Sequence, residues 1–92
     1  MASESGLEGR CRIVAELEGC LLIKLWPLLR GLPDRFLLAP CGRVAIIEFK
    51  SRTGRLSRHQ RLMRLRLETM GFKVYVCRSM TEFREIMRLT RM

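Results

Sequence analysis

The heptapeptide RVAIIEF at Arg43–Phe49 constrains the fold of this chain more than any other segment. Its apolar and β-branched residues, bounded by Gly42 and by a polar loop, predict a buried β-strand. The segment runs into Glu48-Phe49-Lys50, so an acid and a base stand at the end of an apolar strand. Buried charges are costly unless they are paired or bind a metal ion, and these two therefore need an explanation.

Turn and cap signals divide the rest of the chain into elements around this strand. The expected helices are 5–17, 57–70 and 79–89, and the expected strands are 20–25, 34–38, 43–49 and 72–77. Each expected helix has the spacing of a capping box at its start: Ser5 with Glu8, Ser57 with Gln60, and Ser79 with Glu82. The order α-β-β-β-α-β-α predicts one domain over residues 1–92, an α/β sandwich built around one mixed sheet.

The charge of the chain points to a polyanionic partner. Eighteen Lys and Arg residues against nine Asp and Glu residues give a formal net charge of +9. This balance favours nucleic acid or an anionic membrane surface. Between Lys50 and Arg78 the only acid is Glu68. The strand-forming segments and the acids placed among apolar residues argue against the membrane surface, and we expect nucleic acid.

The cysteines and the apolar segments bear on where the protein works. The four cysteines form no CxxC pair and have no histidine at zinc-like spacing, so we expect reduced thiols, with Cys11 and Cys77 in the core. The N-terminus does not resemble a secretory signal, and the longest apolar run is too short to span a bilayer. We therefore expect a cytoplasmic protein, in a bacterial or phage-infected cell, without a membrane partner.

Glu48 and Lys50 lie on one face of the strand, roughly 7 Å apart along the backbone. If Leu38 pairs with Val44, Asp34 lies opposite Glu48 on that same face, whereas a slip of one residue would turn it away. Two adjacent carboxylates favour a hard cation such as Mg²⁺ or Mn²⁺ between them. Such an ion polarises a phosphodiester, and the Lys50 ammonium could orient a water or offset transition-state charge. A plain ion pair between Glu48 and Lys50 is the alternative interpretation.

Four motifs carry a resemblance to a known family: GLPDR at 31–35, GRVAIIEFK at 42–50, GRLS at 54–57 with Gln60, and GFKVYVCRS at 71–79. In this order they resemble the VRR-NUC family, the virus-type replication-repair nucleases of the PD-(D/E)xK superfamily. The resemblance extends from about residue 4 to residue 89. It implies a restriction-endonuclease-like core and a metal-dependent endonuclease that hydrolyses phosphodiester bonds in DNA.

The resemblance also implies roles for single residues. Asp34 and Glu48 resemble the metal-binding carboxylates, with the main-chain carbonyl of Phe49 as a further ligand. Lys50 resembles the catalytic lysine, and Gln60 resembles a glutamine that holds a water or the metal shell. The family has a further glutamate on its first helix, and that role falls on Glu4, with Glu8 one turn later as the alternative.

Basic residues around this site are the expected DNA contacts. Lys24 resembles a lysine that precedes the GLPD motif in the family. Arginines of the loop and helix after the catalytic strand would contact phosphates without sequence preference: Arg52, Arg55, Arg58, Arg61 and Arg64. Charged residues on solvated surfaces are the alternative interpretation for Lys24 and for the arginines of the helix.

Short members of the family resemble Holliday-junction resolvases, which act as homodimers, whereas larger relatives such as the Fanconi-associated nuclease cut flaps. The chain resembles the standalone minimal form. We therefore expect a Mg²⁺-dependent homodimer that cleaves Holliday junctions or other branched DNA, with no nucleotide cofactor. A non-catalytic DNA-binding module on the same fold, or a nuclease for flap or linear DNA, remains the alternative.

Overall fold

The computed structural model describes residues 6–25, 29–33 and 35–92. Its helices are α2 (Leu7–Leu17), α3 (Arg58–Thr69) and α4 (Met80–Arg91). Its strands are β1 (Leu21–Lys24), β2 (Arg35–Ala39), β3 (Arg43–Phe49) and β4 (Val74–Cys77), with a short 3₁₀ turn at Pro40–Gly42. The order α-β-β-β-α-β-α confirms the prediction.

The four strands form one mixed sheet in the order β1-β2-β3-β4. β1, β2 and β3 are antiparallel neighbours, while β4 pairs with β3 in parallel. A parallel pair needs a crossover connection, and α3 provides it. The longest strand, β3, therefore lies in the interior of the sheet with a partner on each side.

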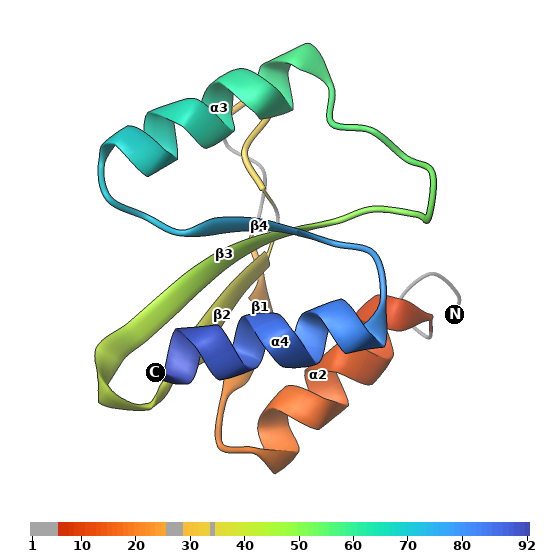
Figure 1. The fold of residues 1–92 in the computed structure, drawn as a ribbon, viewed down its shortest axis with the longest axis vertical. Coiled ribbons are helices and arrows are strands. Elements are labelled where there is room, and N and C mark those ends of the chain that lie inside the picture. Colours follow the sequence, from red (N-terminus) through yellow and green to blue (C-terminus); the bar gives the residue numbers. More distant parts are fainter. Residues whose placement is uncertain (1–5, 26–28, 34) are drawn as a thin grey trace.

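Helices cover both faces of the sheet, as Figure 1 shows, with α2 and α4 on one side and α3 on the other. The larger core lies between the sheet and the pair α2 and α4, and it includes Cys11, Leu37, Ile47, Cys77 and Phe83. The smaller core lies under α3 and is formed by Ile46, Met63, Leu67 and Val74. Cys11 and Cys77 are both fully buried, which confirms their predicted place in the core.

The register of β2 and β3 is the one that the sequence argument required. Leu38 lies opposite Val44, and Arg35 lies opposite Ile47. Residues of β3 alternate between the two cores, with Ile47 and Phe49 toward α2 and α4 and Ile46 toward α3. Glu48, which has the same parity as Ile46, therefore faces α3. Asp34 itself lies outside the described residues.

The three predicted capping boxes have different outcomes. The box of α3 is complete, because the Ser57 hydroxyl accepts from the Gln60 N–H and the Gln60 side chain accepts from the Ser57 N–H. The box of α4 is only half formed, because the Glu82 carboxylate accepts from the N–H of Arg78, one residue before the cap. In α2 the N-cap is Gly6, without a side-chain cap, and Ser5 lies outside the described residues.

The strand predicted at 72–77 is shorter than expected. Phe72 still belongs to the end of α3, because its N–H bonds the carbonyl of Leu67 while the N–H of Gly71 bonds that of Glu68. This pair of bonds is the Schellman motif, and it needs the positive φ of +98° that Gly71 adopts. The helix cap therefore uses Phe72, which the apolar pattern assigns to the strand, and β4 begins only at Val74.

Over the described ranges, none of the helices is long and apolar enough to cross a membrane.

Candidate active site

The structure brings three of the predicted site residues together at the end of β3. Oε2 of Glu48 accepts a hydrogen bond from Nε2 of Gln60 at 3.0 Å and lies 3.7 Å from Nζ of Lys50. The Glu48 side chain is 12% exposed and that of Lys50 is 22% exposed, so both are shielded from water on most sides. The strand period accounts for the pair, since residues two apart share a face, and α3 supplies the amide from above.

Gln60 connects the site to the start of α3. Its Oε1 accepts from the backbone N–H of Ser57 at 2.8 Å, while its Nε2 donates to Glu48. A backbone N–H can only donate, so the amide oxygen must be the atom that faces Ser57. The amide nitrogen is then turned toward the carboxylate. The capping box therefore fixes the orientation of the group that holds Glu48.

The main-chain carbonyl of Phe49 points away from β4. The N–H of Ile46 bonds the carbonyl of Lys73, just before β4, and the N–H of Lys50 bonds that of Cys77 in β4. Even-numbered residues at this end of β3 therefore direct their backbone groups to the β4 side. The carbonyl of Phe49 therefore faces the β2 side, near the segment that contains Pro33. Proline has no N–H, so Pro33 cannot donate to this oxygen. The Phe49 ring packs in the core, 6.3 Å from that of Phe83.

Gly31 lets the segment 31–33, called the GLP segment, lie directly against the start of α3. A Cβ at Gly31, whose φ is +83°, would lie 2.3 Å from the carbonyl oxygen of His59 and 2.9 Å from the N–H nitrogen of Gln60. Beneath this contact, Glu48 and Gln60 border an apolar gap of about 10 Å³ together with Pro33 and Leu56. The side chains that line this gap beside the Glu48 carboxylate are mostly apolar.

A buried arginine near the site was not predicted. Arg35 is 3% exposed, faces the α2 side of the sheet and donates a hydrogen bond to the Glu8 carboxylate. Glu8, the alternative acid of the first helix, is thus held by Arg35. The alternation of Arg35 with the buried residues Leu37 and Ala39 was the available signal, because it places Arg35 on the core face.

A second unpredicted arginine, Arg78, braces the loop that leaves β3. Its Nη1 donates to the carbonyl oxygens of Ser51, at 2.9 Å, and of Gly54, at 2.5 Å. The N–H of Gly54 in turn bonds the Ser51 hydroxyl at 3.0 Å. This loop carries Arg52 and Arg55, both exposed. Arg78 therefore holds the loop through two of its carbonyl groups, while the arginines of the loop itself, Arg52 and Arg55, face solvent.

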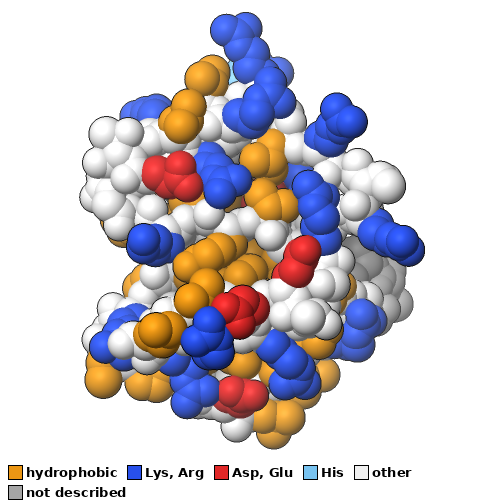
Figure 2. Space-filling view, viewed as in Figure 1, with side chains coloured by type: hydrophobic (Ala, Val, Ile, Leu, Met, Phe, Trp, Pro, Cys, Tyr) orange, Lys and Arg blue, Asp and Glu red, His pale blue; other side chains and the backbone are white. Residues whose placement is uncertain are grey.

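The predicted DNA contacts divide into two groups. Lys24, Arg52, Arg55 and Arg58 are exposed side chains around the catalytic end of the sheet. Arg61 instead donates to the carbonyl of Leu56 at 2.9 Å, and Arg64 donates to Glu68 at 3.1 Å. Figure 2 shows Lys and Arg side chains spread over the face in view, with several acidic side chains among them.

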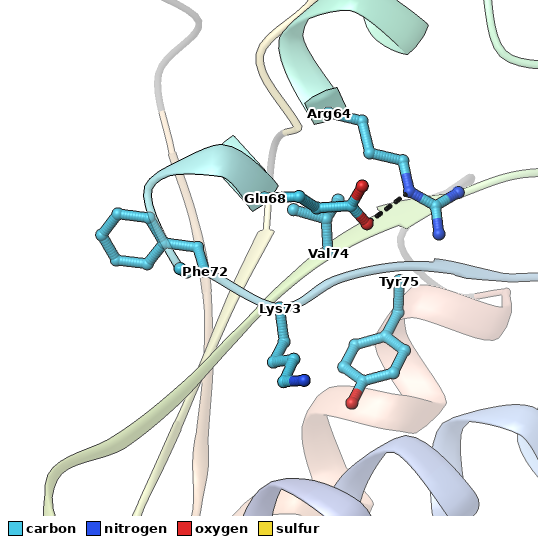
Figure 3. Close-up of a pocket in the computed structure, with 7 residues that line it drawn as sticks. Arg64, Glu68, Phe72, Lys73, Val74 and Tyr75 are labelled. Carbon is cyan, nitrogen blue, oxygen red and sulfur yellow. Dashed lines mark hydrogen bonds and ion pairs between the residues drawn. The ribbon is translucent and has the colours of Figure 1, made fainter. Parts of the chain in front are cut away.

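Arg64 also borders a separate hollow of about 460 Å³ along the outer edge of β4. In Figure 3 its guanidinium is turned toward Glu68, while Lys73 and Tyr75 extend from β4 on the other side of the strand. This hollow contains neither Glu48 nor Lys50. Arg61 and Arg64, which are bonded within the protein, are less available to a phosphate than the four exposed residues.

Two buried thiols lie beneath the catalytic strand. Cys77 is the partner of Phe49 in the parallel ladder, and its Sγ lies 3.4 Å from the carbonyl of Ser79. A hydrogen bond between Cys11 and Cys77, together with burial, raises the pKa of Cys11, and the same bond lowers the pKa of Cys77. Both side chains are closed off from solvent, so they pack α2 against β4 and are not accessible to a substrate.

The oxygens at this end of the sheet suit a hard divalent cation. The Glu48 carboxylate and the Phe49 carbonyl are the kind of ligands that Mg²⁺ and Mn²⁺ prefer. Among the described residues, no three His, Cys, Asp or Glu side chains are grouped so that they could share a metal ion. Asp34 and Glu4, which complete the predicted set, lie outside those residues. The described part of the site thus fits such a cation but contains only part of its expected ligands.

Comparisons with known proteins agree with this fold. A family model described as the VRR-NUC domain matches residues 10–81. A solved structure titled "VRR_NUC domain" superposes with a TM-score of 0.80 at 22% sequence identity, covering 92% of this chain and 94% of that one. No curated protein matches the chain. At this identity the structural match shows a shared fold.

Proposed function

The chain belongs to the VRR-NUC domain family, a family of nuclease domains, and from this premise we propose that it is a magnesium-dependent, structure-specific DNA endonuclease. We propose that it acts as a homodimer on Holliday junctions or other branched DNA. The observation that carries the proposal is the convergence of Glu48, Lys50 and Gln60 at one end of β3. A cytoplasmic location and the use of Mn²⁺ in place of Mg²⁺ belong to the same proposal.

In this proposal the cation is held by Asp34, Glu48, the main-chain carbonyl of Phe49 and one acid of the first helix. The chemistry that a Mg²⁺ ion would supply there, when bound, is polarisation of the phosphodiester and a lower pKa for a bound water. Gln60 holds the Glu48 carboxylate in one orientation, so the ligand does not have to be ordered when the cation arrives. Pro33, Leu56 and Val74 give the gap beside Glu48 an apolar lining.

Lys50 supplies the fixed positive charge of the site. Its ammonium stands 3.7 Å from Glu48 at the end of a strand that is bonded on both sides, so its position varies little. An ammonium held there can orient the attacking water and offset the negative charge that collects on the phosphoryl oxygens in the transition state. Because it is preorganised, this charge costs no reorganisation during the reaction.

Lys24, Arg52, Arg55 and Arg58 are the proposed contacts to the DNA backbone. They are exposed and surround the catalytic end of the sheet, whereas Arg61 and Arg64 bind within the protein. Each phosphate that such a side chain neutralises adds about 0.9 to the slope of log affinity against log salt. Arg61 and Arg64 remain part of the proposed set, as contacts that require their present bonds to rearrange.

The proposed homodimer uses a part of the sheet that none of the described helices covers. Leu21, Leu38 and Val44 are direct neighbours across β1, β2 and β3 and face the α3 side of the sheet, together with Ile23. Leu21, Ile23 and Val44 are 53%, 37% and 39% exposed, and α3 packs instead over Ile46 and Val74. In Figure 1 the hairpin end of β2 and β3 lies well away from α3. These four residues are called the open apolar face.

A second copy fits this face best. A contiguous apolar surface on several strands marks an interaction site, and a twofold axis lets the same surface cover itself. Two chains of charge +9 repel each other wherever Lys and Arg side chains meet, and none of the four residues of the open apolar face is charged. Paired sites are also what symmetric cleavage of a four-way junction requires.

A cleavage assay tests the catalytic part of the proposal. Labelled four-way junction, flap, splayed-arm and duplex DNA are incubated with the protein and Mg²⁺ at one fixed salt concentration. Wild type should cut the junction fastest, and Glu48→Gln and Lys50→Met should each slow cleavage by about a hundredfold or more. Glu85→Gln removes the exposed carboxylate of a glutamate on α4 and should leave the rate unchanged.

The same assay separates the competing functions. Tight binding of the junction without cleavage under Mg²⁺ or Mn²⁺ would replace the nuclease with a DNA-binding module. Faster cleavage of the flap or of linear duplex than of the junction would retain the nuclease and reject the substrate class.

A further inference from the structure

The fourth strand forms an edge of the sheet. β4 pairs with β3 on one side, and among the described residues no strand lies beyond it. The carbonyls of Lys73 and Cys77 accept bonds from the β3 side, so the odd-numbered residues here direct their main-chain groups inward. Val74 and Val76 therefore each direct an N–H and a carbonyl to the open side. An open strand edge of this kind is a template for a further strand.

A hollow of about 460 Å³ runs along this open edge and has two different walls. Arg64 and Glu68 of α3 form one wall, while Lys73 and Tyr75 extend from β4 on the other side of the strand, as Figure 3 shows. Phe72 also lines the hollow and is 46% exposed. The hollow therefore exposes the main chain of the edge and side chains of both faces of the sheet on one surface.

The charges of the hollow favour a protein segment over a nucleic acid. On the α3 wall, Nε of Arg64 lies 3.1 Å from Oε2 of Glu68, so the two charges offset each other. A phosphate chain gains affinity from the cations that it neutralises, and a guanidinium that is already paired with a carboxylate adds little. An extended main chain, in contrast, can bond the outward N–H and carbonyl groups of β4.

The two walls also differ in the side chains that they fit. Successive side chains of an added strand point to opposite faces of the sheet. On the α3 side they meet Val74 and Val76, and the neighbouring hollow along α3 is lined in part by Leu56 and Leu65. On the other side they meet the exposed ammonium of Lys73. The surface thus fits apolar side chains on one face of the segment and acidic ones on the other.

We propose that the outer edge of β4 binds an extended, acidic segment of a partner protein as a further strand of the sheet. Main-chain bonds to Val74 and Val76 hold the segment, and the Lys73 ammonium contacts its acids. Bonds of this kind give affinity, while side chains that alternate between two surfaces give specificity. This inference goes beyond the proposed nuclease function, because the hollow contains neither Glu48 nor Lys50.

The test uses synthetic peptides of defined sequence. The probe is a short fluorescent peptide in which valine alternates with glutamate, and a second peptide replaces every glutamate with lysine. Fluorescence anisotropy gives the affinity, and NMR of the isotope-labelled protein follows amide hydrogen exchange. The glutamate peptide should bind and should slow exchange at Val74 and Val76 by at least about tenfold, because their N–H groups become bonded.

A charge reversal tests the contact to Lys73. Lys73→Glu should weaken binding of the glutamate peptide about tenfold and strengthen binding of the lysine peptide, because opposite charges on neighbouring strands attract and like charges repel. Arg10→Glu is the matched control, since it changes the net charge by the same amount at an exposed position of α2. Salt screens so distant a charge, and each affinity should change by less than about twofold.

Loss of donors tests the main-chain bonds. Methylating every main-chain nitrogen of the glutamate peptide keeps its side chains but removes its N–H groups, and binding should be lost. Val76→Pro removes an outward N–H without breaking a bond to β3, and edge strands tolerate proline at such positions, so binding should weaken about tenfold. The methylated peptide requires no change in the protein, so this part of the test holds even if Val76→Pro does not fold.

Other results overturn the inference. A glutamate peptide that does not bind wild type, or that binds without slowing exchange at Val74 and Val76, shows an edge that is protected rather than used. A methylated peptide of equal affinity shows that no strand is added, and equal losses for Lys73→Glu and Arg10→Glu show attraction by net charge alone. Exchange at Val76 that slows with protein concentration assigns the edge to a second copy. Exchange that slows with oligothymidylate instead of the peptide assigns the hollow to nucleic acid.

Discussion

Gln60 performs two tasks with one amide group. Its oxygen completes the cap of α3 at the N–H of Ser57, and its nitrogen holds Oε2 of Glu48. The stability of α3 and the orientation of the proposed ligand are therefore coupled through a single side chain. A substitution that changes only one end of the amide can separate the two tasks.

Gln60→Glu makes that separation. A glutamate at this position still accepts from the Ser57 N–H, as in the usual capping box, but it has no N–H to donate to Glu48 and brings a second carboxylate beside it. We expect the free energy of unfolding to change by less than about 1 kcal/mol while the cleavage rate falls about 10–100-fold. Urea unfolding and junction cleavage are the measurements. Ser57→Ala is the converse control: it should cost about 1 kcal/mol of stability and leave cleavage nearly intact. Equal rates for Gln60→Glu and wild type would show that the bond to Glu48 has no catalytic role.

The sequence predicted some residues of the site and missed others. Glu48 and Lys50 were predicted because strand periodicity alone places them together, and Gln60 because its capping spacing and its motif agree. The pairing of Arg35 with Glu8 joins residues 27 positions apart, and nothing in local spacing indicates how α2 lies on the sheet. Arg78 was missed for a related reason, since its bonds depend on the path of an irregular loop.

On the face of the sheet that carries Glu48, α3 lies in direct contact with the GLP segment. Elements with strong local signals, such as β3 and α3, were predicted nearly to their ends. The close approach at Gly31 was not, because it depends on where α3 crosses the sheet. The strand was predicted to start at Phe72, because the apolar pattern includes that residue. In the structure Phe72 caps the preceding helix, and β4 starts at Val74.

Gly31→Ala tests that contact against a matched glycine. Gly31 and Gly19 have similar positive φ values of +83° and +79°, but a Cβ at Gly19 meets nothing within 4 Å, whereas at Gly31 it would lie 2.3 Å from the His59 carbonyl oxygen. Gly19→Ala should therefore cost only the backbone term of about 1–2 kcal/mol. Gly31→Ala should cost at least about 2 kcal/mol more, because the start of α3 must move away. Urea unfolding of both variants gives the comparison, and equal losses would mean that the GLP segment yields without disturbing α3.

For the whole molecule, the balance between charge and apolar surface governs association. A chain of 92 residues with a net charge of +9 repels its own copies in most orientations, yet it leaves three strands uncovered along the open apolar face. The sequence indicated a basic, nucleic-acid-binding α/β domain. It could not show which apolar positions the helices leave exposed, because that depends on the length and placement of α3 over the sheet.

Val44→Lys tests whether the open apolar face joins two copies. Val44 is 39% exposed, so the lysine can reach solvent in the monomer and the fold should tolerate it. A twofold interface would bring two such charges into an apolar contact, and we expect association to weaken at least about tenfold. Sedimentation equilibrium should then show a dimer for wild type and a monomer for the variant at the same concentration.

The same variant connects association to the reaction. On a cruciform plasmid, a dimer with two active sites should linearise the circle in one binding event. The Val44→Lys monomer should cut one strand only and release nicked circles. This single cut should still depend on Lys50. Ile13→Lys places a lysine at an equally apolar position of α2 that is 52% exposed, on the other side of the sheet, and should remain dimeric and linearise the plasmid. A Val44→Lys protein that stays dimeric would assign the interface elsewhere. A monomeric wild type that still linearises the plasmid would remove the need for paired sites, because two independent encounters would then account for both cuts.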